Sequence, residues 1–229
     1  MGLSIDDMKK PLIIDIITLF PDFFKSPLSE SIIKIAQDEH VEIIVHNLRD
    51  YTYDKHKTCD DKPFGGGPGM VMKPEPIFEC VEEIKKERPS SRLIFLTPQG
   101  EQLKQSRLKE LSVSDGFILL CGHYEGIDQR VRDELVDLEI SIGDYVLTGG
   151  EIPALTVIDG VIRLIPGVLG NAESIIHESF QGEYLDHPHY TRPRVYRDME
   201  VPEVLVSGNH QAVEEWRKEE SIRITKERS

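Results

Sequence analysis

The chain has 229 residues, of which 39% are hydrophobic and 30% charged, and its formal net charge is −14. This length suits one large domain, or one domain with a smaller companion, and the composition supports an ordinary globular core. The acidic balance is atypical of a nucleic-acid-binding protein, and the apolar runs are far too short to span a bilayer, which argues against a membrane protein.

Cysteine usage and the first residues bear on where the protein works. Cys59, Cys80 and Cys121 are odd in number, far apart and free of any C-x-x-C pattern. We therefore expect reduced thiols in a cytoplasmic protein. The first eleven residues, MGLSIDDMKKP, lack the apolar stretch and cleavage site of a signal peptide.

The first half of the chain predicts two strands and two helices. Residues 11–20 and 41–48 are isoleucine- and valine-rich runs that we interpret as strands, and residues 26–40 carry apolar side chains at helical spacing. Residues 49–73 have no clear period and include a glycine-rich stretch, and such a long loop is usually functional or mobile. Residues 74–88 open with prolines and close with lysine and arginine, as helices do.

The middle of the chain alternates between strand and helix patterns. Strands that alternate with helices imply a mainly parallel sheet covered on both faces. The expected strands are residues 92–100, 116–122 and 138–143, and the expected helices are residues 101–111, 127–136 and 151–167.

Three glycine-bearing loops follow the strands of this region, at residues 96–101, 121–128 and 141–151. In parallel sheets ligands bind beyond the carboxyl ends of the strands, so we expect these loops to form one site. Neither of the phosphate-binding motifs G-x-G-x-x-G and G-x-x-x-x-G-K-S/T occurs in them. The loops therefore give no sign of a ligand with a phosphate chain. An NAD or nucleotide enzyme on an ordinary doubly wound sheet stays open as an alternative.

From Pro166 onward the chain is rich in Pro, Gly, His and Tyr, and its pattern loses periodicity. We expect an α/β domain over residues 1–169, a linker over 170–186 and a small second domain over 187–229. A helix over residues 210–224 is predicted to turn Val213, Trp216 and Ile222 inward.

The second domain differs in charge from the rest of the chain. Acidic and basic residues balance after His187, so the acidic excess lies before it, and Arg192, Arg194 and Arg197 could meet RNA phosphates. The alternative is that residues 187–197 form only an irregular linker, and that the acidity elsewhere only serves solubility.

Six motifs occur in an order that resembles a known family. They are GGGPGM, TPQG, CGHYEGID, SIGDYVLTGGE, IPGVLGN and HPHYTRP, and the similarity runs from about Ile14 to about Arg223. The chain resembles the bacterial tRNA (guanine-N1)-methyltransferases, the TrmD family, which act on guanosine 37.

The resemblance implies a SPOUT-type α/β fold with a deep C-terminal trefoil knot and a small, mostly helical C-terminal domain that binds tRNA. It also implies S-adenosylmethionine held in the knotted loops, and a homodimer whose active sites span the interface. Periodicity and composition say nothing of a knot, which general rules disfavour.

The resemblance also implies catalytic roles for three residues. Glu178 stands where the family has an aspartate general base, and the neighbouring His177 is a chemically plausible substitute. Arg163 would stabilise negative charge on O6 of guanine, and Glu125 would lie near the methionine end or serve a magnesium requirement. From the residues alone, Glu178 is a surface acid in a polar linker, and Arg163 complements the dipole at a helix end.

The sequence departs from the family pattern in two ways, a short C-terminus and the Asp-to-Glu change at Glu178. These departures leave a second interpretation open, a non-catalytic RNA-binding protein with a shortened C-terminal domain. Mg²⁺ is a candidate second cofactor, and we assign no metal-ligating residues. For Asp128, in the same loop as Glu125, the alternative to a role in the site is to cap the following helix. The expected S-adenosylmethionine contacts are Leu96, Pro98, Gly122, Tyr124, Ile142, Gly143, Asp144, Tyr145, Val146, Leu147, Gly149 and Gly150.

Overall fold

The computed structural model describes residues 10–169, 178–180 and 182–228. Its residues group into two compact units, Met1–Gly170 and Asn171–Ser229, called unit 1 and unit 2 below. The domain and linker boundaries given above stay predictions, and His177 lies outside the described residues. No helix within the described ranges is long and apolar enough to cross a bilayer.

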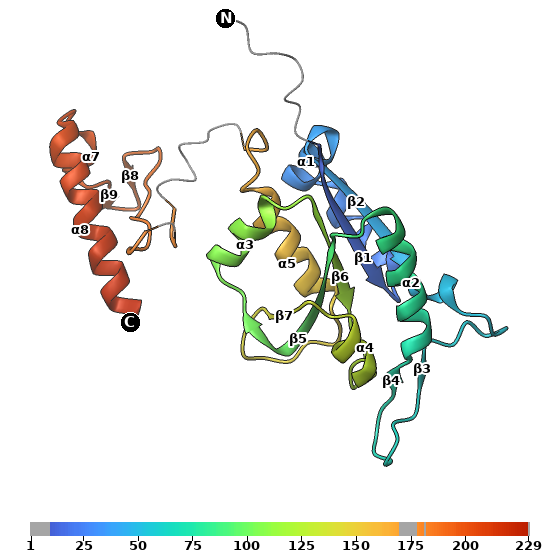
Figure 1. The fold of residues 1–229 in the computed structure, drawn as a ribbon. Helices are drawn as coiled ribbons and strands as arrows, with labels where there is room; N and C mark the ends of the chain where they lie inside the picture. The colour runs from blue at the N-terminus through green and yellow to red at the C-terminus, as the bar shows by residue number, and fades with distance from the viewer. Residues whose placement is uncertain (1–9, 170–177, 181, 229) are drawn as a thin grey trace, which may run out of the picture. The chain divides into compact units, whose positions relative to one another are not determined.

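Unit 1 is built on a five-stranded sheet in the order β2-β1-β6-β5-β7, and every neighbouring pair is parallel. Figure 1 shows these strands with helices on both sides. The predicted mainly parallel α/β sheet is therefore confirmed. The strands are β1 (Leu12–Thr18), β2 (Val41–Asn47), β5 (Arg92–Gln102), β6 (Gly116–Cys121) and β7 (Leu138–Ser141).

Alternate residues of the sheet feed two hydrophobic clusters. On β6, Phe117 and Leu119 join the cluster under α1, α3 and α5, whereas Ile118 and Leu120 join the cluster under α2 and α4. This period of two, with apolar residues on both faces, is what a strand buried on both sides requires. The helices are α1 (Ser31–Glu39), α2 (Pro74–Glu87), α3 (Gln105–Ser112), α4 (Gln129–Glu134) and α5 (Glu151–Ile162).

Several boundaries differ from expectation. Glu101 and Gln102 extend β5 after a register shift instead of opening a helix. The predicted helix over 26–40 is divided into η2 (Pro27–Ser29) and α1, because Glu30 between them is extended and Ser31, the first residue of α1, has a positive φ of 51°. α5 ends at Ile162, short of Pro166, which disfavours helical backbone in the residue before it.

Short elements occur in two connections. The 3₁₀ helices η1 (Pro21–Phe24) and η2 (Pro27–Ser29) lie between β1 and α1, and the region of the long loop over 49–73 contains η3 (Leu48–Tyr51) and the antiparallel pair β3 (Asp60–Asp61) and β4 (Val71–Met72).

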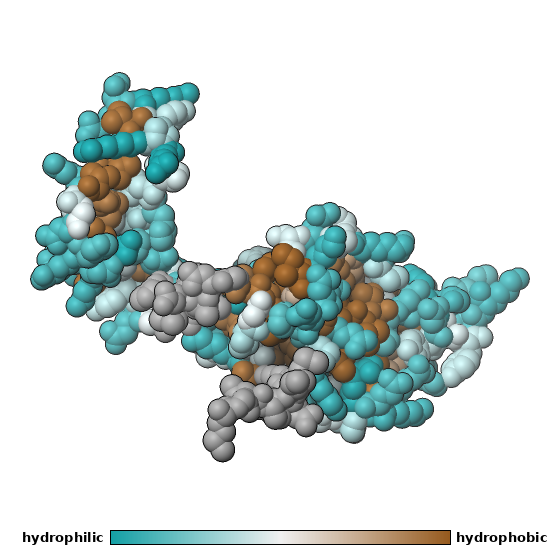
Figure 2. Space-filling view, turned by 90° about the horizontal axis from the view of Figure 1, so that it is seen from above, coloured by the Kyte–Doolittle hydropathy of each residue, from teal (hydrophilic) through white to brown (hydrophobic). Residues whose placement is uncertain are grey.

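The described residues of unit 2 form a small hairpin and two helices. They are β8 (Val195–Tyr196), β9 (Met199–Glu200), α7 (Glu203–Val206) and α8 (His210–Arg228). Trp216 on α8 lies near the rings of His187 and Tyr190, so its predicted inward orientation is confirmed. None of the described residues of unit 2 is fully buried. Apolar side chains form a visible stripe on its surface in Figure 2.

Candidate functional site

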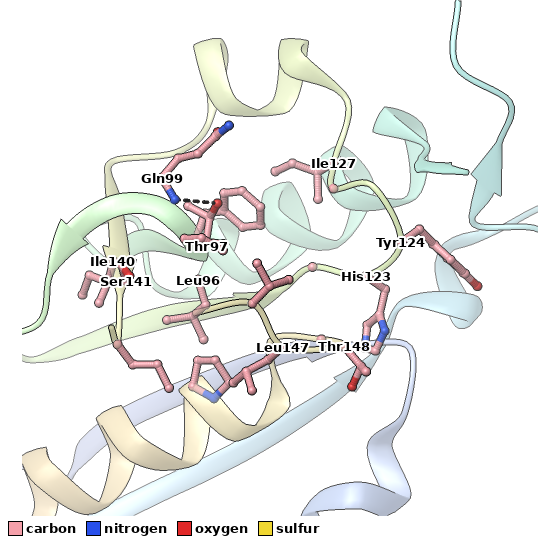
Figure 3. A pocket seen from close by; sticks show the side chains of 18 of the residues that line it. Leu96, Thr97, Gln99, His123, Tyr124, Ile127, Ile140, Ser141, Leu147 and Thr148 are labelled. Carbon is pink, nitrogen blue, oxygen red and sulfur yellow. Dashed lines mark hydrogen bonds between the residues drawn. The ribbon is translucent and has the colours of Figure 1, made fainter. Parts of the chain in front are cut away.

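A cavity of about 380 Å³ opens at the carboxyl ends of β5, β6 and β7. Its wall comes from three segments, residues 95–99, 122–127 and 140–149 without Asp144, together with Arg132 and Pro153. Figure 3 shows side chains of all three segments around the cavity. The three glycine-bearing segments therefore meet, as predicted, although residues 96–101 belong to β5, at its register shift, and not to a loop after it. The volume lies within the roughly 300–1,000 Å³ typical of small-molecule sites.

Most of the expected site residues in unit 1 line this cavity. Asp144 is exposed and does not line it, and neither does Gly150, which is buried. Arg163 lies elsewhere on unit 1. The lining residues that were expected are Leu96, Pro98, Gly122, Tyr124, Glu125, Ile142, Gly143, Tyr145, Val146, Leu147 and Gly149.

Further lining residues were not singled out in the sequence. Most lie within the predicted loops, so their place along the chain was the available signal. Arg132 on α4 and Pro153 in the first turn of α5 carry no such signal. The full additional set is Phe95, Thr97, Gln99, His123, Gly126, Ile127, Arg132, Ile140, Ser141, Thr148 and Pro153.

The loop after β7 is shaped by Ser141 and Gly143. The Ser141 hydroxyl donates to the Gly143 carbonyl at 3.0 Å and accepts from the Gly143 amide at 3.2 Å. Gly143 has a φ of +155°, and the Tyr145 ring occupies the space that a Cβ would need. A side chain at position 143 would therefore displace Tyr145 from the cavity wall.

The loop after β6 turns sharply at Tyr124, whose φ of 58° is uncommon for a residue with a side chain. The Gly126 amide closes the turn by donating to the His123 carbonyl at 3.0 Å. Burial, followed by the nearby Asp60 carboxylate, raises the pKa of Tyr124. Tyr124 is therefore a neutral phenol at physiological pH, and its side chain points away from the centre of the cavity in Figure 3.

The glycine-rich stretch over residues 63–70 leads directly into the same wall. The Glu125 amide donates to the Met70 carbonyl at 3.0 Å, and the Met72 amide donates to the Gly126 carbonyl at 2.9 Å. The Glu125 carboxylate lies so close to Gly69 that a Cβ there would collide with it. Glu125 is the only carboxylate among the described residues that line the cavity.

Glu151, a residue that sequence reasoning missed, is a buried carboxylate at the start of α5 and is 4% exposed. It accepts a hydrogen bond from the Thr18 hydroxyl at 2.7 Å, and both its oxygens lie 2.8 Å from Nε2 of His123. A carboxylate in the first turn of a helix also suits the helix dipole. Glu151 thus fixes the His123 side chain of the cavity wall.

Arg132 on α4 contacts side chains of both β5 and β7 beside the cavity. Its guanidinium makes a bidentate pair with the Glu139 carboxylate at 2.7 Å, and its other nitrogen donates to the Gln99 side chain at 2.6 Å. The same guanidinium lies 5.8 Å from the centre of the Phe95 ring. These contacts hold α4, β7 and the part of β5 after Leu96 in a fixed arrangement.

The other two expected catalytic residues lie outside the cavity wall. Arg163 is half-buried and follows the last residue of α5, as the helix-end interpretation requires. Glu178 belongs to unit 2, where it is half-buried and lines a separate hollow. Asp128 accepts from the Arg130 amide at 2.9 Å, so its predicted role as the cap of α4 is confirmed.

The three cysteines are free and buried. Burial raises the pKa of Cys80 to about 12 and raises that of Cys121 well above its usual value. Cys121 directly precedes the cavity-lining Gly122, yet it stays a neutral thiol and is unsuited to nucleophilic chemistry.

Comparison with known proteins finds one family and close relatives. The family model described as tRNA (Guanine-1)-methyltransferase TrmD matches residues 12–229. Relatives named tRNA (guanine-N(1)-)-methyltransferase include one from Dictyoglomus turgidum, 54% identical over 93% of this chain and 86% of its own length. Those from Gloeothece citriformis and Clostridioides difficile are both 55% identical over 93% of this chain, covering 93% and 94% of their own lengths.

Proposed function

The chain belongs to the tRNA (Guanine-1)-methyltransferase TrmD family, and from this premise we propose that it methylates N1 of guanosine 37 in tRNA with S-adenosylmethionine as donor. The observation that carries the proposal is the cavity formed by three glycine-bearing loops at the carboxyl ends of β5, β6 and β7. These loops carry no phosphate-binding pattern, which suits an adenosine ligand without a phosphate chain.

The residues of the cavity fit such a ligand. Leu96, Ile140 and Leu147 offer an apolar wall, and Gly122 leaves room beside Phe95, since a Cβ there would lie 2.8 Å from the Phe95 ring. Backbone groups of the glycine-bearing loops can read the polar edges of a flat, apolar base. When bound, S-adenosylmethionine would supply an electrophilic methyl group on a sulfonium.

The chain must supply a base and a positive charge. N1 of guanine carries a proton at neutral pH, so methylation needs a group that accepts it, and the charge that develops on O6 needs stabilisation. In this proposal the Glu178 carboxylate takes the proton and the Arg163 guanidinium stabilises O6. The role of Glu178 rests on its match to the family aspartate; Glu keeps the carboxylate and lengthens the side chain by one methylene.

The position of Arg163 supports a homodimer. The cavity meets α5 at its first turn, whereas Arg163 follows its last residue, and twelve helical residues span roughly 18 Å. Arg163 is therefore far from the cavity of its own chain, and we propose that the partner subunit's Arg163 completes each site. Exposed apolar side chains near the cavity mouth, including Val146 and Ile152, are suited to an interface.

The proposal extends to the trefoil knot and to tRNA. The knot is supported by the tight passage of the chain at Gly150, whose amide donates to the Gly122 carbonyl at 3.0 Å. Contact with tRNA is supported by residues 190–198 of unit 2, which are all exposed and include Arg192, Arg194 and Arg197. We further propose a cytoplasmic location, which suits a tRNA substrate and buried free thiols.

Substitution of Glu178 tests the mechanism. Glu178→Gln should keep the wild-type dissociation constant for S-adenosylmethionine, in calorimetry, because Glu178 does not line the cavity. Its single-turnover rate on a tRNA transcript with G at positions 36 and 37 should fall roughly 10²- to 10⁴-fold, the usual contribution of a general base.

Two variants serve as controls. Glu178→Asp restores the family residue and should keep most of the rate, and Glu183→Gln changes an exposed carboxylate nearby and should leave the rate unchanged. Unchanged turnover in Glu178→Gln would remove Glu178 from the mechanism. A wild-type chain that binds tRNA but transfers no methyl group would favour the non-catalytic RNA-binding protein. Absence of a heat of binding for S-adenosylmethionine in calorimetry would contradict the proposal.

A further inference from the structure

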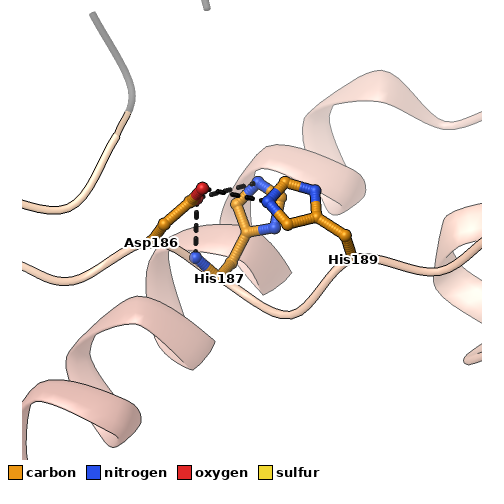
Figure 4. A group of neighbouring side chains, drawn as sticks. All are labelled: Asp186, His187 and His189. Atoms are coloured by element: carbon orange, nitrogen blue, oxygen red, sulfur yellow. Dashed lines mark hydrogen bonds and ion pairs between the residues drawn. The ribbon is translucent and has the colours of Figure 1, made fainter. Parts of the chain in front are cut away.

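Unit 2 holds a group of metal-ligand side chains that no role above explains. Asp186, His187 and His189 each offer one ligand atom, and these atoms lie within 4.8 Å of one another. The His189 Nε2 atom lies 2.9 Å from Oδ2 of Asp186, and the His187 Nε2 atom lies 3.8 Å from Oδ1. Figure 4 shows the two imidazole rings converging on the carboxylate.

His187 is prepared to bind a metal through Nε2. Its Nδ1 atom lies 3.1 Å from the Pro188 carbonyl oxygen, which can only accept a hydrogen bond, so Nδ1 carries the proton. In the neutral ring Nε2 then has its lone pair free. A backbone carbonyl that fixes the ring tautomer is the usual outer partner of a metal-binding histidine.

Asp186 is held in place by hydrogen bonds. Its carboxylate accepts from the His187 amide at 2.8 Å and lies 2.9 Å from Nε2 of His189. Its own amide donates to the Ser179 hydroxyl at 2.9 Å, and the preceding Leu185 amide donates to Thr225 of α8 at 2.8 Å. The ligand segment is thus fixed from both sides before any ion binds.

The surroundings favour a cation. The three side chains line a hollow of about 500 Å³, whose other charged residues are Glu178, Glu183, Glu214, Arg217 and Lys218. Arg217 pairs with Glu214 at 2.6 Å, so these two charges offset each other. Counted with Asp186, the lining has four carboxylates against one arginine and one lysine.

We propose that Asp186, His187 and His189 bind one divalent transition-metal ion of the Zn²⁺ type, with water completing the coordination. Zinc binds imidazole nitrogen and carboxylate oxygen at roughly 2.0–2.2 Å, so two of its ligand atoms are at most about 4.3 Å apart. Both distances to Asp186 satisfy this limit. The His189 side chain is 70% exposed and can rotate to bring its nitrogen within reach of the same ion.

The ion would replace the proton shared by His189 and Asp186, and would tie residues 186–189 into one chelate beside α8. Two imidazoles select zinc, cobalt or nickel over magnesium, which prefers oxygen ligands and retained water. The site is thus separate from the candidate Mg²⁺ requirement, and it stands whether or not the chain transfers a methyl group.

The test is titration of the tag-free, metal-stripped full chain with ZnCl₂ in calorimetry. We expect one ion per chain with a micromolar or tighter dissociation constant. Trp216 is the only tryptophan, and its ring centre lies 6.4 Å from that of His187, so its fluorescence should change over the same titration. Co²⁺ should give the visible absorption bands of a low-symmetry nitrogen–oxygen site, whereas MgCl₂ should not compete.

Matched variants locate the ion. His189→Ala and Asp186→Asn should each weaken Zn²⁺ binding at least tenfold, while the exposed His210→Ala and Asp198→Asn in the same unit should bind like the wild type. Circular dichroism of His189→Ala, whose ring is exposed, verifies that the variant is folded. Absence of saturable binding, or equal affinity in His189→Ala and His210→Ala, would overturn the proposal.

Discussion

Glu151 joins three segments that are distant in the sequence. It begins α5, it accepts a hydrogen bond from Thr18 at the end of β1, and it pairs with His123 in the loop after β6. Thr18 is fully buried and Glu151 nearly so. The carboxylate therefore stabilises the cavity wall without lining the cavity itself, and its loss would leave two polar partners unsatisfied.

At the residue scale, Glu151→Ala should lower the free energy of unfolding of unit 1 by about 3 kcal/mol, because breaking a buried pair leaves a desolvated group without its partner. The measurement is urea unfolding followed by far-UV circular dichroism, with Trp216 fluorescence reporting unit 2 separately. Glu134→Ala, an exposed carboxylate at the end of α4, should change stability by less than about 0.5 kcal/mol. Equal stabilities of the two variants would contradict this account.

At the scale of elements, α5 packs closely against two neighbours at glycines. Gly150, which precedes the helix, lies against β6, and Gly160, within the helix, lies against α3. At Gly150 a Cβ would lie 2.6 Å from the Cα of Cys121, which is backbone of β6. At Gly160 a Cβ would lie 2.7 Å from a terminal methyl of Leu108 on α3. The first neighbour cannot move without shifting a central strand, whereas the second can rotate.

The two glycines therefore predict different outcomes for the same substitution. Gly150→Ala should destabilise unit 1 by at least the roughly 1–3 kcal/mol of an overpacked core and should weaken S-adenosylmethionine binding. Gly160→Ala should be close to neutral, because alanine favours the helix by about 1 kcal/mol and offsets the rearrangement of Leu108. Thermal melting and calorimetry of both variants check this, and a Gly160→Ala loss as large as that of Gly150→Ala would refute it.

At the scale of the whole molecule, the proposed dimer divides each active site between two chains. A cavity from one chain and Arg163 of the partner subunit would be needed together. Two inactive variants, one changed in the cavity and the other at Arg163, should then recover activity when they form a mixed dimer. One of the two sites of that dimer contains neither change.

The pair to mix is Arg163→Ala and Leu147→Arg, the latter placing a charged side chain in the cavity wall. Each alone should be nearly inactive in tRNA methylation, and the refolded mixture should recover roughly a quarter of wild-type activity from one intact site in half of the dimers. Arg163→Ala mixed with the double variant Leu147→Arg/Arg163→Ala should stay inactive. No recovery in the first mixture, with mixed dimers verified by native mass spectrometry, would rule out shared sites.

How much could be predicted from the sequence depends on how local each feature is. The strand–helix alternation and the loops at Leu96, Gly122 and Gly143 follow from periodicity and glycine placement, so the sheet and the cavity were predictable. The role of Glu151 was not, because its partner Thr18 lies 133 residues away. β5 continues through Glu101 and Gln102 because β7 accepts them after a register shift, a tertiary effect that helix propensity cannot report.

Asp186, His187 and His189 lie close together in the sequence, so their proximity was visible from the start. What the sequence could not supply is the carbonyl contact that sets the His187 tautomer, or the hollow of acidic residues around it. In the sequence, the Arg, His and Tyr composition of this segment indicates RNA contact just as well as metal binding.

The strand order also governs how the chain folds as it leaves the ribosome. β1 lies between β2 and β6, yet β2 ends at Asn47 and β6 begins at Gly116. One edge of β1 stays unpaired while the ribosome adds the residues between them, on the order of several seconds at about 5–20 residues per second. During this interval the nascent chain exposes an isoleucine-rich edge of the kind that invites aggregation. The topology thus delays the covering of this edge of β1 until β6 has been synthesised.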